Sequence, residues 1–283
     1  MFLPDFLAPP QSPDAIKACC AFIYEHEWLQ LLLGDSYHPG KLALTRRLGE
    51  MLGLQSTDRV LDVASGPGTA AIFLAQTFGC EVVGVDLAPN LVQKANQQAA
   101  EAGLVDRVRF QQGDAERLPF DDASFDVVIC ECAFCTFPDK ETAACEFARM
   151  LRTDGRIGIS DLTKSGPLPP ELETLMAWVA CIADARPLDG YVTILSNAGL
   201  AVRQIENHDK ALYDLIQEIR GRLLGVELVV KLKNLDLPIP VDWDEAGRVA
   251  KLTAEVLREG RLGYALFTGD SLPKAFTPKK SAL

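Results

Sequence analysis

The chain has 283 residues, of which 48% are hydrophobic, and it carries a formal net charge of −11. This hydrophobic content suffices for a packed core, whereas no cluster of Lys and Arg could follow a phosphate backbone, so we expect no nucleic-acid partner. Because no apolar stretch is long enough to span a bilayer and the first residues lack a cationic leader, we expect no membrane association and a cytoplasmic protein.

The N-terminal region is predicted to be helical. Ser12 can cap a helix over residues 13–33, because its side chain accepts a hydrogen bond from a free backbone N–H group. A loop over 34–40 leads to a second helix over 41–54. We interpret residues 1–40 as an N-terminal helical cap segment.

Strands and helices then alternate, which predicts a parallel sheet covered by helices. The predicted strands cover 58–64, 81–86, 107–112, 125–131 and 155–161. The predicted helices between them cover 69–78, 89–103 and 139–151.

The pattern changes after a proline-rich break. Two helices are predicted over 170–184 and 188–198, and a strand over 201–208 follows them. Two more helices, over 209–224 and 243–259, are separated by a proline-bearing loop over 234–242. The last predicted strand covers 263–269. The late helices separate the last two strands. We therefore expect residues 209–262 to be a helical insertion that caps the substrate site, and 263–283 to be the last strand and tail.

A glycine-containing turn is the strongest functional signal. Residues 60–69 read VLDVASGPGT, so an apolar strand enters a turn with Gly66 and Gly68, and Asp86 ends the next strand. Glycine has no Cβ and allows a ligand to approach the backbone closely. In α/β domains this arrangement binds an adenosine-containing cofactor, with the carboxylate of Asp86 on the ribose hydroxyls.

Two classes of cofactor fit this turn. Gly66, Gly68 and Ala71 also match the loose dinucleotide fingerprint. However, Asp62 lies inside the strand, where a carboxylate would repel a pyrophosphate and attract an ammonium or a sulfonium. The spacing therefore favours S-adenosylmethionine (SAM), and an NAD(P)-dependent reductase is the alternative from another class.

The turn resembles motif I of the class I SAM-dependent methyltransferases. Residues 113–120 resemble the family's acidic loop after the third strand, 124–131 resemble its fourth strand, and 151–161 resemble the turn into its fifth. The resemblance implies an α/β fold: a Rossmann-like seven-stranded sheet with a helical cap and a SAM-binding core over 41–208. It implies that SAM is bound by Tyr37, Asp62, Ala64, Ser65, Gly66, Gly68, Asp86, Leu87, Gly113, Asp114, Ala115 and Glu131.

Cysteines gather where the substrate would lie. Of the eight in the chain, Cys132 and Cys135 directly follow the predicted fourth strand, and Cys181 comes after the fifth. Cys19 and Cys20 are adjacent in the first helix. Thiolates bind soft ligands, although a free cysteine is also often a small buried hydrophobic residue.

This arrangement resembles the arsenite methyltransferases within the SAM family. The resemblance implies Cys132 and Cys181 as catalytic residues and a metalloid such as arsenite as the substrate. Its possible ligands are Cys19, Cys20, Cys132, Cys135 and Cys181, with no resident metal. The chain departs from that family at residues 33–40, where the Tyr-Gly-Cys-Gly segment expected before the first long helix is missing.

His38 is a further catalytic candidate, as a general base or a contact of the lid over SAM, and a purely structural loop histidine is the alternative. Other acceptors also fit the motifs: a carbon, oxygen or nitrogen atom of a small metabolite. A SAM-binding subunit without activity is a third possibility. The sequence does not indicate an oligomeric state.

Overall fold

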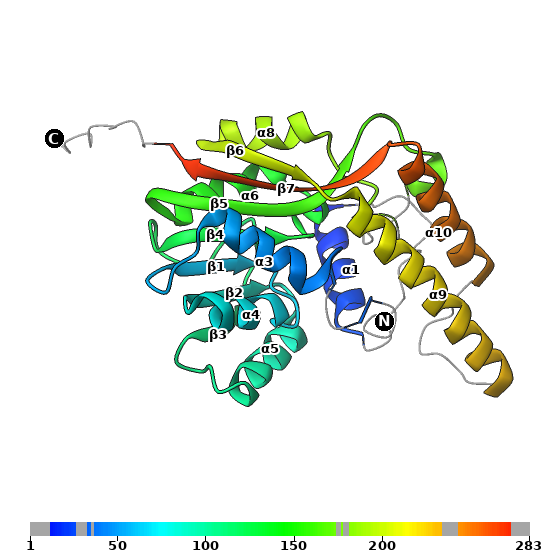
Figure 1. Ribbon diagram of the computed structural model, residues 1–283, viewed down its shortest axis with the longest axis horizontal. Coiled ribbons are helices and arrows are strands. Elements are labelled where there is room, and N and C mark those ends of the chain that lie inside the picture. The colour runs from blue at the N-terminus through cyan, green and yellow to red at the C-terminus, as the bar shows by residue number, and fades with distance from the viewer. Residues whose placement is uncertain are drawn as a thin grey trace.

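The fold was analysed in a computed structural model, which describes residues 12–26, 33–34, 37–173, 177, 181–233 and 243–272. It contains a seven-stranded sheet with the order β3-β2-β1-β4-β5-β7-β6 (Figure 1). The strands pair in parallel except β7, which is antiparallel to both β5 and β6. The predicted Rossmann-like seven-stranded sheet is confirmed.

The elements have the following bounds. The strands are β1 (Arg59–Val63), β2 (Glu81–Asp86), β3 (Val108–Gln112), β4 (Phe125–Glu131), β5 (Leu151–Lys164), β6 (Leu200–Asn207) and β7 (Leu262–Ser271). The helices are α1 (Pro13–Tyr24), α3 (Lys41–Leu52), α4 (Thr69–Phe78), α5 (Pro89–Glu101), α6 (Lys140–Met150), α8 (Leu188–Asn197), α9 (Asp209–Lys233) and α10 (Trp243–Arg258), with short 3-10 helices η1 (Phe134–Thr136) and η2 (Pro170–Leu172).

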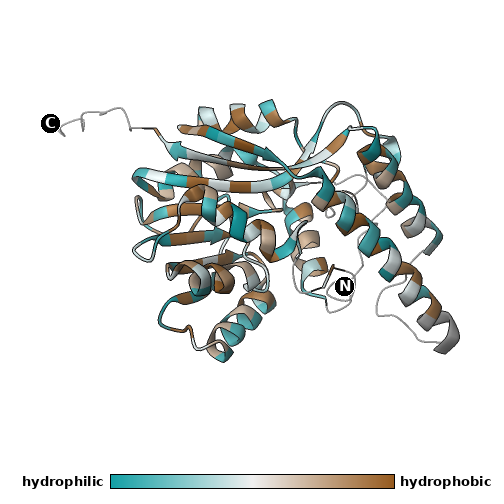
Figure 2. Ribbon diagram, viewed as in Figure 1, coloured by the Kyte–Doolittle hydropathy of each residue, from teal (hydrophilic) through white to brown (hydrophobic). Residues whose placement is uncertain are grey.

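Two apolar cores cover the two faces of the sheet. Alternate residues of a strand point to opposite faces, so Val60 joins the core under α3, α4 and α5, while Leu61 and Val63 join the core under α6 and α8. Figure 2 shows many hydrophobic residues in the central strands and mixed hydropathy along the outer helices. Each fully buried side chain of this kind contributes about 1.5–3 kcal/mol through removal of apolar surface from water.

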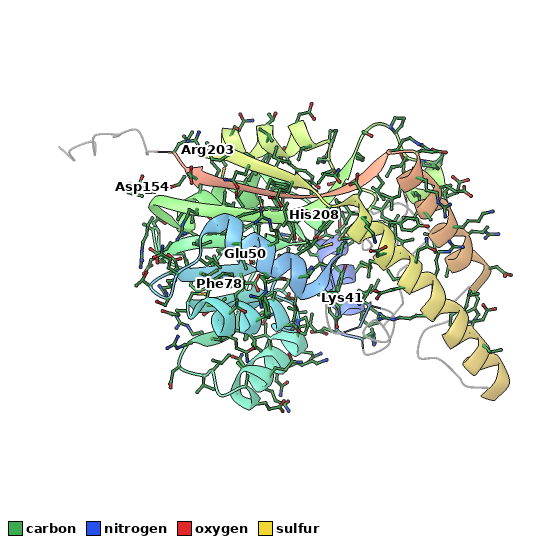
Figure 3. All side chains as sticks on the ribbon, in the orientation of Figure 1. Lys41, Glu50, Phe78, Asp154, Arg203 and His208 are labelled. Atoms are coloured by element: carbon green, nitrogen blue, oxygen red, sulfur yellow. The ribbon has the colours of Figure 1, made fainter. Side chains whose placement is uncertain are left out.

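The helical insertion lies at the carboxyl ends of the parallel strands. Figure 1 shows α1, α9 and α10 beyond this edge of the sheet. Lys41, labelled in Figure 3 at the start of α3, places its Nζ atom 2.8 Å from a carboxylate oxygen of Glu218 on α9. Leu212 and Ile216 of α9 belong to the same apolar core as Cys181. The insertion is therefore on the side of the sheet where the cysteines lie.

Among the described helices, none is both long and apolar enough to cross a membrane.

Several predicted boundaries differ from the structure. The strand predicted over 155–161 is β5, which runs from Leu151 to Lys164 because its last residues pair with the start of β7. The helix predicted over 209–224 is α9, which continues to Lys233. Helix α1 ends at Tyr24, and Glu25 and His26 are not helical, so the predicted helix over 13–33 is too long. Residues 27–32, the loop over 234–242 and most of the tail lie outside the described residues.

The predicted helix over 170–184 is wrong at both ends, because Pro170–Leu172 form only the short 3-10 helix η2 and residues 181–184 are not helical. Cys181 lies in a turn with φ of +65° rather than in a helix. The backbone N–H groups of Ile182 and Ala183 both donate to the carbonyl oxygen of Ala177, at 2.8 and 3.0 Å. This pattern ends a helix by a left-handed residue, a position that glycine usually occupies. Because Cys181 stands there instead, the sequence carries no visible stop signal.

Close packing behind the glycine turn gives a first prediction. A Cβ atom on Gly68 would lie 2.6 Å from Cζ of Phe110 and 2.8 Å from Cβ of Ala95, and φ is +83°. We expect Gly68→Ala to lower the free energy of unfolding by about 2–4 kcal/mol, from backbone strain and overpacking together. Urea unfolding followed by circular dichroism measures this change.

Gly53 provides the matched control. Its φ is +62°, but nothing lies within 4 Å of a Cβ atom placed there. Gly53→Ala should therefore cost only the left-handed backbone strain, about 1 kcal/mol. Equal losses in both variants would show that packing at Gly68 contributes nothing.

Candidate cofactor and thiol site

A cavity of about 160 Å³ opens between α1 and the carboxyl ends of β1, β2 and β4. The sheet order reverses between β1 and β4, and open α/β sheets bind ligands at such a point. Every residue predicted to bind the cofactor lines this cavity except Gly68, which precedes α4. Cys132 and His38 also line it, whereas Cys181 lies behind Cys132.

The glycine turn holds the first carboxylate of the cavity. Gly66 has φ of +54°, and its N–H group donates to Oδ2 of Asp86 at 2.8 Å. The N–H group of Ala88 donates to Oδ1 of Asp86 at 2.9 Å. Burial raises the pKa of Asp86, and these two donors counteract it. The carboxylate is therefore fixed in place, and its remaining lone pairs can accept further hydrogen bonds.

Two further carboxylates are buried beside it with unused oxygen atoms. Within the described part of the chain, Oδ2 of Asp62 and Oε1 of Glu131 are buried and have no hydrogen-bond partner. Burial raises the pKa of Asp62, and the nearby charges of Glu131 and Asp86 add to this effect. Unpaired buried carboxylate oxygens are costly, so a cation in this cavity would be strongly favoured. These acceptor oxygens therefore fit the ammonium group of SAM.

Polar contacts connect helix α1 to two segments beside the cavity. The Nζ atom of Lys17 lies 2.8 Å from Oδ2 of Asp114 and also pairs with Glu116. At the end of the helix, Glu25 accepts from the backbone N–H and side-chain amide of Asn90, at 2.9 and 3.0 Å. Helix α1 thus joins the acidic loop after β3 to the start of α5.

The vicinal cysteines of α1 face different surroundings. Cys20 lines the cavity, whereas Cys19 packs with Ile16 and Ile23 in a separate small apolar cluster. The side chain of Cys19 is therefore outside the cavity. Cys20 is the member of the pair that lies near Cys181.

Cys132, Cys135 and Cys181 form a group that we call the thiol cluster. The sulfur atoms of Cys132 and Cys181 lie 3.9 Å apart. Cys135 and the hydroxyl of Tyr24 of α1 also lie near the sulfur of Cys181. The structure thus brings together the two cysteines predicted to share a pocket, with Cys135 as a third sulfur.

The thiol cluster favours one thiolate. The neighbouring side chains of Cys132 and Cys135 hold the pKa of the Cys181 thiol well below its usual range, against the effect of burial. The contact with Cys181 raises the pKa of Cys132, and burial raises that of Cys135. The sulfur of Cys181 lies 3.3 Å from the carbonyl oxygen of Cys132, a contact that favours an S–H group.

Backbone strain is concentrated at two of these residues. Cys132 and Cys181 have φ values of +54° and +65°, in the region that favours glycine. A left-handed conformation of a residue with a side chain costs about 1 kcal/mol or more, and such strain clusters at functional sites. Glycine would relieve the strain at either position, so the two sulfur atoms are the features that the chain keeps there.

Asp161, at the end of β5, is a site residue that the motif analysis did not single out. It is fully buried, and its Oδ2 atom accepts from the N–H group of Cys135 at 2.8 Å. Burial raises its pKa to about 7. Lys17, Tyr24 and Thr45 were also missed. Their contacts join segments distant in sequence, and no local pattern indicates them.

The described ranges contain no group of three or more His, Cys, Asp or Glu side chains arranged to hold a metal ion.

The raised pKa of Asp161 predicts a pH-dependent stability. Its pKa is about 7 in the folded protein and near 3.9 in an unfolded chain, so between these values the folded state binds more protons. The contribution of Asp161 to the free energy of unfolding is therefore fully present below about pH 4 and is lost as the pH rises to about 7. We expect Asp161→Asn to remove this pH dependence. Urea unfolding of both proteins at pH 5 and pH 8 tests it, and parallel curves would contradict the prediction.

Comparisons with known proteins agree with this site. The methyltransferase domain family matches residues 60–155. The O-methyltransferase cnsE of Penicillium expansum is 30% identical over 235 residues, which cover 81% of this chain and 78% of that protein. An arsenite methyltransferase of Halobacterium salinarum is 31% identical over 175 residues, which cover 61% of this chain and 44% of that protein.

The chain spans 59% and 61% of the length of two other methyltransferase relatives. Among solved structures, phosphoethanolamine N-methyltransferase 2 of Haemonchus contortus, in complex with phosphomonomethylethanolamine and S-adenosylhomocysteine, has a TM-score of 0.72 at 19% identity. That likeness covers 93% of this chain and 59% of the other and shows a shared fold. The identity to cnsE over 78% of that protein, together with the domain match, shows that the chain belongs to the methyltransferase family.

Proposed function

We propose that this protein transfers the methyl group of SAM to a small-molecule acceptor. The observation that carries the proposal is the buried trio of Asp62, Asp86 and Glu131 in one cavity at the sheet reversal. We assign Asp86 to the ribose hydroxyls, and Asp62 and Glu131 to the ammonium. The loop of Asp114 and Ala115 would border the adenine.

The protein's own contribution to such a reaction is alignment and exclusion of water. Bound SAM supplies an electrophilic methyl group on a sulfonium, whose departure as a neutral thioether needs no acid. The residues around it therefore have to place the acceptor in line with the carbon–sulfur bond and keep the path dry. Cys132 lies on the cavity wall at this edge, so the acceptor would sit at the thiol cluster.

For the acceptor, we propose a trivalent metalloid such as arsenite, bound by the thiol cluster. Each S–H group that displaces a metalloid hydroxyl forms a metalloid–sulfur bond and releases water. The metalloid keeps its lone pair, which forms the new bond to the methyl carbon while the carbon–sulfur pair returns to the cofactor. The methylated centre then carries the positive charge that the sulfonium loses.

Three observations support this acceptor. Cysteine sulfurs are the ligands that soft centres prefer, and the sulfur of Cys181 lies beside those of Cys132 and Cys135. Two of the three cysteines keep a strained backbone. A relative 31% identical is named an arsenite methyltransferase. The sulfur atoms of Cys132 and Cys181, at 3.9 Å, would close up on a shared ligand atom.

A hydroxyl acceptor is the second candidate. The relative that this chain covers most fully in the comparisons reported above is named an O-methyltransferase. A hydroxyl needs its proton removed, and buried carboxylates such as Glu131 and Asp161 could accept it. In that case the cysteines would serve as packing residues. The insertion over 209–262 would act as the cap in either case, and a cytoplasmic location and the absence of a nucleic-acid partner stay predictions.

The cofactor assignment predicts selective binding of SAM. Asp86→Ala should weaken the affinity for S-adenosylhomocysteine by about 1–3 kcal/mol, because two ribose hydroxyls lose a charged acceptor. Isothermal titration measures this loss. Asp106→Ala removes an exposed carboxylate before β3 and should leave the affinity unchanged. Tight binding of NADH without binding of SAM would refute the assignment.

The metalloid assignment predicts loss of activity without loss of cofactor. With glutathione present, the protein should methylate arsenite, and Cys132→Ser and Cys181→Ser should each abolish this while retaining affinity for S-adenosylhomocysteine. Mass spectrometry of the products and titration measure the two properties. Cys145→Ser is the matched control, because this thiol is exposed on α6 outside the thiol cluster.

Two results would contradict the metalloid assignment. One is a wild-type protein that binds SAM but leaves arsenite unmethylated. The other is an unchanged rate of arsenite methylation in Cys132→Ser and Cys181→Ser. In either case the chain would remain a methyltransferase with another acceptor.

A further inference from the structure

Thr45 is a polar exception on the buried face of α3. The other buried residues of this helix are Leu44, Leu48, Gly49 and Leu52. Thr45 has no exposed surface, and valine has the same shape without a hydroxyl. The buried hydroxyl therefore needs partners, and those it has identify its role.

The hydroxyl of Thr45 links a loop to the cavity. It donates to Oε2 of Glu131 at 3.0 Å. Nε2 of His38 lies 3.3 Å from the hydroxyl oxygen of Thr45. The other ring nitrogen of His38, Nδ1, lies 3.1 Å from the carbonyl oxygen of Pro39. Because a carbonyl only accepts, Nδ1 carries a hydrogen. Both ring nitrogens of His38 thus have a protein atom within hydrogen-bond distance, namely the carbonyl oxygen of Pro39 and the hydroxyl of Thr45.

This chain of bonds fixes one oxygen of Glu131 and leaves the other available. The side chain of Glu131 is only 4% exposed. Its Oε2 atom is held by Thr45, whereas Oε1 has no partner among the described residues. Glu131 lines the cavity, and we assign its free oxygen to the cofactor side. A glutamate without this anchor would have three rotatable bonds, and ordering it would weaken binding.

We propose that Thr45 and His38 are positioning residues that hold Glu131 for the amino-acid end of the cofactor. The inference rests on the proposed function, because it takes the ligand to be SAM. It assigns His38 to the support of Glu131 and not to general-base catalysis. Thr45 acts on the cofactor only through Glu131. Its effect on cofactor binding is therefore confined to the ammonium group.

A pair of ligands separates this role from a general effect on the fold. S-adenosylhomocysteine has the amino-acid end, whereas 5′-methylthioadenosine has the adenosine and the sulfur but no ammonium. We expect Thr45→Val to weaken binding of S-adenosylhomocysteine about five- to tenfold and to leave binding of 5′-methylthioadenosine unchanged. Thr45→Ser, which keeps the hydroxyl, should restore the first affinity.

A matched threonine and a double variant complete the test. Thr253 is also buried, but its hydroxyl donates to the carbonyl oxygen of Val249 in its own helix at 2.8 Å. Thr253→Val should leave both affinities unchanged. If His38 acts through Thr45, His38→Ala combined with Thr45→Val should weaken binding no more than Thr45→Val alone.

The outcomes are distinguishable in isothermal titration. Equal weakening of both ligands by Thr45→Val, or no weakening of either, would overturn the positioning role. Binding of 5′-methylthioadenosine also reports that the variant has folded, and a Thr45→Val protein that fails to bind it would count against the proposal. A wild-type protein that binds neither ligand would instead refute the cofactor assignment itself.

Discussion

Three carboxylates meet in one buried cavity, and their mutual repulsion governs the rest of the site. Asp62, Asp86 and Glu131 stand on three parallel strands whose carboxyl ends share one edge of the sheet. Asp86 is stabilised by two backbone N–H groups, which the glycine turn and the start of α5 supply. The other two each retain an unpaired oxygen. A low-dielectric cavity with surplus negative charge is incomplete until a cation enters it.

The thiol cluster also contains buried ionisable groups, but here neighbouring side chains of the protein stabilise them. The pKa of Cys181 is held well below its usual range by the neighbouring side chains of Cys132 and Cys135. Lys140, only 1% exposed and paired with Asp184, adds a buried positive charge that favours the thiolate. Cys132 belongs to both sites, because it lines the cavity and contacts Cys181. A cationic methyl donor and a soft acceptor could therefore meet at this residue.

The sequence was sufficient to predict the sheet and most of the residues that line the cavity, because both depend on local patterns. Alternating strands and helices specify a parallel sheet, and the glycine turn fixes which strand ends carry the ligand. The turn at Cys181 escaped prediction because a cysteine occupies a position that glycine normally marks. Thr45 escaped because one threonine in an apolar stripe fits a buried helix as well as valine does. Its meaning depends on Glu131, 86 residues away.

Helix α1 shows why such long-range contacts have to be seen in three dimensions. Its ion pair between Lys17 and Asp114 is partly exposed, at 19% and 32%, and pairs of this kind contribute little stability. Its apolar residues pack mainly with one another rather than in the two large cores. The helix is therefore held by modest forces, yet it supplies Lys17 to the acidic loop and Tyr24 to the sulfur of Cys181. One weakly anchored element thus contacts both the cofactor cavity and the thiol cluster, so the two sites cannot be independent of each other.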